Sequence, residues 1–189
     1  MTKTNDTNPF SLLGLAQRFD IDEDAIERAY LQRVTQLHPD MGGEAADFDT
    51  AELNQARQIL LDDEQRANLI LDLINGPTAS QCKELPDGFL MDMMVRREEI
   101  EEHIQSGGQE SRENWESWAH QERAAYAQAV GELFDSVSTE QSQDEQSIND
   151  DQRSTTLVEI RTQLNAWRYI ERLIEQLDPD YDPAHADFR

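Results

Sequence analysis

The chain has 189 residues, of which 37% are hydrophobic and 30% are charged. This composition suits a folded protein with one sizeable core or two smaller ones, and it excludes a wholly disordered chain. Forty acidic residues against sixteen basic ones give a net charge of −24. Such a surface repels phosphate backbones and anionic lipid, so we expect neither a nucleic-acid partner nor a membrane partner.

The cysteine content and the N-terminal segment bear on the cellular compartment. Cys82 is the single cysteine, which excludes a disulfide within the chain, a Cys-rich zinc site and a cysteine-ligated iron–sulfur cluster. The first ten residues have neither the apolar stretch of a secretory signal nor the Arg-rich character of a transit peptide. We expect a cytoplasmic protein without a cofactor.

Helical spacing of apolar residues dominates the first half of the chain, whereas the alternation typical of strands is nearly absent. The spacing predicts helices over 10–17, 22–38, 49–61 and 64–74. The second of these ends at Pro39, because the residue before a proline avoids the helical region. The segment Asn75–Thr78, which reads NGPT, is a strong stop and marks the predicted domain boundary.

The second half is predicted to be helical as well. The spacing there predicts helices over 89–104, 113–137 and 155–177. Ser106-Gly107-Gly108 separates the first two, and a Ser-, Gln- and acid-rich segment at about 138–152 predicts a flexible linker. Residues 179–189 form a predicted tail. The fold class is therefore all-α.

His38-Pro39-Asp40 falls in the predicted loop between two amphipathic helices. No apolar stripe needs these polar side chains, and proline stiffens the loop by fixing its own φ angle. A stiff, polar tip suits presentation to a partner protein. The alternative is a simple helix end, in which His38 lies near the terminal carbonyls and Pro39 only terminates the helix.

The wider sequence around this tripeptide resembles a J-domain over residues 9–76. The similarity is carried by "PFSLLGL", by "LQRVTQLHPD" and by "AELNQARQILLDDEQRA". Over residues 85–178, "LPDGFLMDMMVRREEIEE" and "LNAWRYIERLIEQLD" resemble the C-terminal domain of the HscB-type co-chaperones of iron–sulfur cluster assembly. The resemblance implies an N-terminal J-domain hairpin joined to a C-terminal three-helix bundle.

The resemblance also implies a non-enzymatic adaptor with two protein partners. One is an HscA/DnaK-type ATPase chaperone, whose ATP hydrolysis the J-domain would stimulate; the matching residues are His38, Pro39, Asp40, Arg28 and Arg33. The other is an IscU-type scaffold protein, which the bundle would hold and deliver to the chaperone. The residues that match the scaffold-binding patch are Leu90, Met91, Met94, Glu98, Glu102 and Tyr169.

The residues of the patch also have a plain structural interpretation. Leu90, Met91, Met94, Glu98 and Glu102 share one helix face by their spacing, and methionines suit an adaptable binding surface. In the alternative interpretation Phe89, Leu90, Met93 and Met94 are core, as a stripe of Leu and Met at helical spacing usually is, and the two glutamates are an ordinary solvated face. Arg28 and Arg33, five residues apart, diverge by about 140° on a helix and can equally be ordinary surface charges.

Two other functions fit parts of the sequence. The chain could be a J-domain adaptor that recruits a chaperone to a different client, with the acidic stretch 107–152 as a client-binding arm. It could also be an enzyme or metal protein that uses His38, Asp40 and His103 or His120. Against the second alternative, the sequence has no HExxH motif, nucleophile elbow or phosphate-binding loop.

Overall fold

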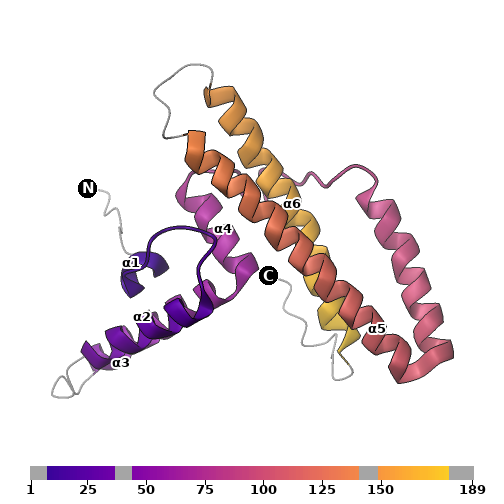
Figure 1. Ribbon diagram of the computed structural model, residues 1–189, viewed down its shortest axis with the longest axis horizontal. Coiled ribbons are helices and arrows are strands. Elements are labelled where there is room, and N and C mark those ends of the chain that lie inside the picture. The colour runs from indigo at the N-terminus through magenta and orange to yellow at the C-terminus, as the bar shows by residue number, and fades with distance from the viewer. Residues whose placement is uncertain (1–7, 37–43, 141–148, 179–189) are drawn as a thin grey trace. The chain divides into compact units, whose positions relative to one another are not determined.

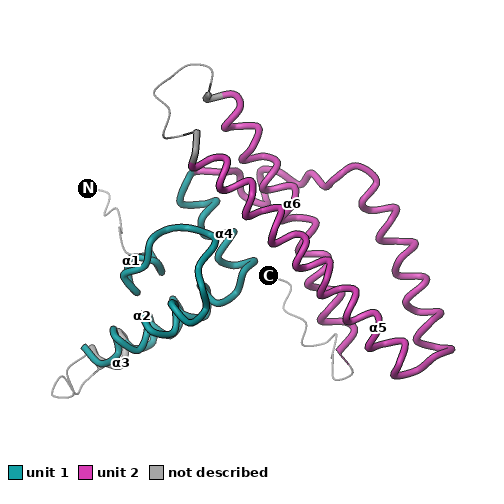
Figure 2. The backbone as a smooth tube through the Cα atoms, viewed as in Figure 1, with its two compact units in different colours: residues 1–74 teal, residues 75–189 magenta. Residues whose placement is uncertain are grey.

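The computed structural model describes residues 8–36, 44–140 and 149–178, and the regular secondary structure of these residues consists of helices without any strand. The all-α prediction is therefore confirmed for the described part of the chain. The chain divides into two compact units, residues 1–74 and residues 75–189 (Figure 2). The division falls beside Asn75, whose φ of 60° lies in the left-handed region that ends helical segments.

The first unit contains four helices, α1 (Pro9–Leu13), α2 (Glu23–Gln36), α3 (Glu44–Leu61) and α4 (Asp63–Leu73). Helix α1 is shorter than the helix predicted over 10–17. It begins at a reciprocal cap, in which the backbone N–H of Ser11 donates to Asn8 Oδ1 at 3.1 Å and the N–H of Asn8 donates to Ser11 Oγ at 2.9 Å. It ends because Gly14 adopts a left-handed conformation with φ of 73°.

Helices α2 and α3 lie side by side as a hairpin (Figure 1). The core of this unit is mainly apolar and comes from the inner faces of its helices; among its buried residues are Phe10, Leu13, Ile26, Leu53, Ala56 and Leu60. A polar contact adds to this packing where Tyr30 Oη donates to Asn54 Oδ1 at 2.6 Å. Helix α4 is capped at its N-terminus by Asp62, whose carboxylate accepts from the backbone N–H of Gln65 at 2.9 Å.

The second unit contains α5 (Phe89–Glu140) and α6 (Asn149–Leu177). Helix α5 is two helical arms, because Gly108 has non-helical angles of φ 60° and ψ −134°. This positive φ is easily adopted only by glycine. The chain therefore reverses there, and we call residues 89–107 the first arm and residues 109–140 the second arm (Figure 1).

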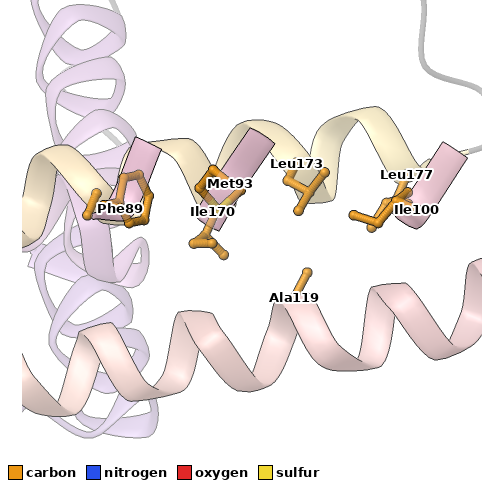
Figure 3. Close-up of a cluster of buried hydrophobic side chains, with 8 residues drawn as sticks. Phe89, Met93, Ile100, Ala119, Ile170, Leu173 and Leu177 are labelled. Atoms are coloured by element: carbon orange, nitrogen blue, oxygen red, sulfur yellow. The ribbon is translucent and has the colours of Figure 1, made fainter. Parts of the chain in front are cut away.

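The two arms and α6 surround a shared apolar cluster. It draws Phe89, Met93 and Ile100 from the first arm, Ala119 from the second arm, and Ala166, Ile170, Leu173 and Leu177 from α6 (Figure 3). All of these side chains are at least nine-tenths buried. The unit is therefore the three-helix bundle that the sequence predicted.

The helices are longer than predicted around the second connection. Of the segment 138–152, predicted as a linker, residues 138–140 belong to α5 and residues 149–152 belong to α6. Residues 141–148, and the tail predicted over 179–189, lie outside the described residues. Within the described part of the chain, no helix is both long enough and apolar enough to cross a membrane.

Candidate functional site

The loop predicted to contact a chaperone lies beyond the described end of α2. His38, Pro39 and Asp40 fall within residues 37–43, which are outside the described residues. The described part of this candidate site is helix α2 itself, which carries Arg28 and Arg33.

The two arginines of α2 have different surroundings. Arg28 is exposed, whereas Arg33 is half-buried. The guanidinium of Arg33 lies against the end of α1, so closely that a Cβ atom added to Gly14 would be 2.8 Å from Arg33 Nη2. Arg28 is consequently the freer of the two to meet a partner, while Arg33 also packs within its own unit.

An ion pair fixes α2 against α3 on the hairpin that would carry the loop. Arg57 Nε donates to both carboxylate oxygens of Glu27, at 2.9 and 2.8 Å, and Arg57 Nη2 also donates to Glu27. The guanidinium lies 5.4 Å from the ring centroid of Tyr30. The hydrogen bonds from Arg57 lower the pKa of Glu27, and Glu27 in turn raises the pKa of Arg57.

The second candidate site is an apolar patch on the first arm of α5. Leu90 is 52% exposed, Met91 65%, Met94 69% and Val95 51%. Within the described residues, the only other large hydrophobic side chain with comparable exposure is Leu31, at 58%. Four such side chains within six consecutive residues form a concentrated apolar surface, which we call the α5 patch (Leu90, Met91, Met94 and Val95).

Helical spacing explains why the α5 patch is exposed. Met93 follows Phe89 by four residues and Ile100 follows Met93 by seven, so the three side chains lie on one face of the helix. They point into the cluster of Figure 3. The patch residues fall on the other side of the same helix. The interpretation of Leu90 and Met94 as core residues is therefore wrong, although it is right for Phe89 and Met93.

The other three predicted scaffold-binding residues divide into two groups. Glu98 and Glu102 are exposed on the first arm, in the turns that follow the α5 patch. Tyr169 on α6 is half-buried and packs against the bundle core, where its ring meets that of Phe89 edge to face with centroids 5.5 Å apart. Tyr169 therefore lies beside Phe89, the residue that precedes the patch, and part of its side chain is covered by the bundle.

Sequence reasoning missed Val95 as a member of the apolar surface. The signal was present, because Val95 follows Met91 by four residues and so lies one turn along the same face. The structure groups Val95 with its three apolar neighbours by exposure.

Of the residues considered for a metal or catalytic alternative, the structure describes only His103 and His120. Among the described residues, no group of three or more His, Cys, Asp or Glu side chains is arranged to hold a metal ion. His103 instead stacks on Trp115, with ring centroids 5.7 Å apart and planes at 26°. His120 is exposed on the second arm, and His38 and Asp40 lie outside the described residues.

Comparisons with known proteins agree with this architecture. Residues 8–69 match the model of the DnaJ domain. They include α1, α2, α3 and most of α4, so the match identifies a J-domain within the first unit.

Similar proteins point to a narrower group among the J-domain proteins. The co-chaperone protein HscB of Proteus mirabilis is 32% identical over 101 residues, which are 49% of this chain and 58% of the relative. The HscB homologue of Ralstonia nicotianae is 28% identical over 71% of this chain and 80% of the relative. The fold is shared with human HscB, with a TM-score of 0.67 at 19% identity, covering 94% of this chain and 83% of the human one. It is also shared with HscB from Vibrio cholerae, with a TM-score of 0.59 at 20% identity, over 90% and 99% of the two chains. The DnaJ-domain match, the HscB relatives and the HscB structures together support an HscB-type J-domain protein.

Proposed function

We propose that this protein is a cytoplasmic, non-enzymatic co-chaperone of iron–sulfur cluster assembly. Its first unit stimulates the ATPase of an HscA/DnaK-type chaperone, and its second unit binds an IscU-type scaffold protein and delivers it to that chaperone. The observation that carries the proposal is the α5 patch, an exposed apolar surface on a bundle with the HscB fold. A monomeric protein seldom exposes such a concentrated apolar surface without a partner.

The chemistry of the α5 patch suits a protein partner. Methionine side chains are flexible and polarisable, so Met91 and Met94 can adapt to an apolar surface on the scaffold. Glu98 and Glu102 extend this face with two exposed carboxylates, which would form a polar rim around the apolar centre. Such a rim favours a scaffold surface in which an apolar area is bordered by basic side chains.

On the chaperone side, the proposal rests on the J-domain match and on the exposed position of Arg28. His38, Pro39 and Asp40 are proposed to make the contact that stimulates ATP hydrolysis, and Arg28 to make an adjacent contact from α2. Arg33 is proposed as a weaker contributor, because its guanidinium is already packed beside Gly14.

Reconstitution with purified partners tests the proposal. The ATPase rate of an HscA-type chaperone is measured alone, with this protein, with an IscU-type scaffold, and with both. We expect this protein to raise the rate by itself and to raise it further with the scaffold. Stimulation that the scaffold never enhances, together with no measurable scaffold binding, would favour an adaptor for a different client. No stimulation at all would overturn the proposal.

A further inference from the structure

Arg96 occupies an inward position of the first arm of α5, where the helical pattern calls for an apolar residue. The buried residues Met93 and Ile100 lie three residues before and four residues after it. This spacing places Arg96 in the same stripe as the core residues and on the side opposite the centre of the α5 patch. The side chain of Arg96 is still 43% exposed, so its charge is only partly withdrawn from water, and the guanidinium has an aromatic partner on the inward side.

Two tryptophans of the second arm supply that partner. The guanidinium carbon of Arg96 lies 5.0 Å from the ring centroid of Trp118 and 5.8 Å from that of Trp115. The two indoles meet edge to face, with centroids 5.5 Å apart and planes at 83°. Arg96 Nη1 also donates to Glu99 Oε2 at 3.1 Å, within its own helix. A cation over an indole face is the strongest cation–π arrangement that natural side chains provide.

This contact joins the two arms at the turn that carries two of the four residues of the α5 patch, Met94 and Val95. Arg96 directly follows Val95 and is two residues from Met94, both of which point to solvent. No residue between Met93 and Ile100 is buried in the bundle core. The side chain of Arg96 therefore provides the inward contact of this turn.

We propose that Arg96 is a positioning residue, which anchors the patch-bearing arm to Trp115 and Trp118 and thereby holds the α5 patch in its binding geometry. This inference rests on the proposed function for its partner, an IscU-type scaffold, and it assigns a role to residues outside the patch itself. A preordered surface binds more tightly because less conformational freedom is lost on association.

Hydrogen exchange of the full-length protein without any partner tests the anchoring. Arg96→Ala should speed exchange of the amides of residues 94–99 by roughly two- to fivefold, the range that corresponds to an exposed cation–π contact. Arg97→Ala removes the same charge one residue further along, on the exposed side, and should leave these rates unchanged. Arg96→Lys retains a cation and should restore most of the protection.

Affinity for the purified scaffold tests the positioning. Arg96→Ala should weaken binding by roughly two- to fivefold, and Arg96→Lys should recover most of it. If Arg96 acts through its contact with the indoles, Arg96→Ala should weaken scaffold binding by a smaller factor in a Trp118→Leu background than in the wild type.

Unchanged exchange in Arg96→Ala overturns the anchoring, and faster exchange with unchanged affinity overturns the positioning role. Absence of scaffold binding by the wild type overturns the proposed function instead, and the exchange rates alone then decide the anchoring.

Discussion

The ring of Tyr169 meets the ring of Phe89 edge to face, with centroids 5.5 Å apart and planes at 78°. This contact joins α6 to the first turn of α5, immediately before Leu90. Phe89 is 9% exposed and Tyr169 is half-buried. The pair therefore lies between the bundle core and Leu90, the first residue of the exposed α5 patch. Tyr169 can thus affect a partner in two ways, through its hydroxyl or through the position of the first turn.

Two substitutions at Tyr169 separate these roles. Tyr169→Phe keeps the ring contact, so we expect unchanged thermal stability, and a fall in scaffold affinity would then assign a contact to the hydroxyl. Tyr169→Ala removes the ring and should lower the free energy of unfolding by about 2–4 kcal/mol, less than a fully buried aromatic would. Equal stability of the alanine variant and the wild type, measured by urea unfolding, would show that the ring contact does not support the bundle.

The triple variant Leu90→Ala, Met91→Ala and Met94→Ala should weaken scaffold binding at least tenfold, because it removes the apolar centre of the α5 patch. Its stability should change little, since all three side chains are more than half exposed. Met93→Ala is the matched control on the same helix. Met93 is 7% exposed, and its truncation should cost about 2–5 kcal/mol of unfolding free energy.

Isothermal titration with the scaffold and thermal melts measure both quantities. If the triple variant binds the scaffold as the wild type does, the α5 patch is not the binding surface. If it loses as much stability as Met93→Ala, the three side chains contribute to the core, contrary to their exposure.

The sequence predicted the helical class because the apolar spacing of three and four residues is maintained along most of the chain. It also placed the reversal of α5 correctly, since consecutive glycines at 107 and 108 weaken a helix and Gly108 alone takes the positive φ. It overextended the first helix to residue 17. Gly14 terminates α1 at Leu13, and a lone glycine is a weaker stop signal in a sequence than a pair.

Spacing could not decide which of two adjacent apolar stripes faces the core. The run from Phe89 to Val95 is almost continuously apolar, so Met93 and Met94 are equivalent by type and differ only in direction. Three-dimensional packing against α6 decides the matter, by burying Met93 and exposing Met94. The contact of Arg96 with Trp118 could not be predicted from the sequence either, because it depends on how the two arms pack against each other.

Lowering the pH should reduce the stability of the first unit, because protonation of Glu27 removes its ion pair with Arg57. Hydrogen bonds from Arg57 lower the pKa of Glu27 from its ordinary value of 4.5 in the folded state. A carboxyl whose pKa is lower in the folded state contributes stability above the unfolded value, and this contribution is lost as the pH falls through the folded value. The stability difference between the wild type and Glu27→Gln should therefore be largest near neutral pH and shrink below about pH 4.5.

Urea unfolding between pH 7 and pH 3 measures this difference. The control is the same substitution in an Arg57→Met background, where the difference should be small and nearly independent of pH. A difference that remains constant from pH 7 to pH 3 in the wild-type background would mean that the ion pair does not contribute to the folded state.

His38→Gln should abolish stimulation of the chaperone ATPase and leave the melting temperature unchanged. The reason is that His38 is predicted from the sequence to lie in a loop, and a loop residue outside an apolar stripe contributes little to core burial. His120→Gln, an exposed histidine of the second arm, is the matched control and should stimulate normally. Normal stimulation by His38→Gln would contradict the loop assignment, whereas a large fall in melting temperature would support the alternative in which His38 stabilises the helix end.

Chaperone stimulation should depend only mildly on salt. The first 76 residues of this chain carry 6 basic and 15 acidic residues, so long-range electrostatic attraction to the chaperone should be weak. At physiological ionic strength, charges separated by more than about 8 Å are largely screened. The contacts that remain are short-range ones, and on α2 the exposed Arg28 is the main candidate.

Arg28→Ala should raise the concentration for half-maximal stimulation by roughly two- to fivefold, the range for an exposed charge contact. Arg33→Ala should raise this concentration by a smaller factor, because the Arg33 guanidinium lies against Gly14. Either arginine substitution should raise it more than Glu23→Ala on the same helix does. Half-maximal stimulation is measured for each variant from 50 to 500 mM salt, concentrations chosen to span roughly a threefold range of screening length. A steep loss with salt in the wild type would reveal a stronger electrostatic contact elsewhere. Wild-type stimulation by both arginine variants would show that α2 is not the docking face.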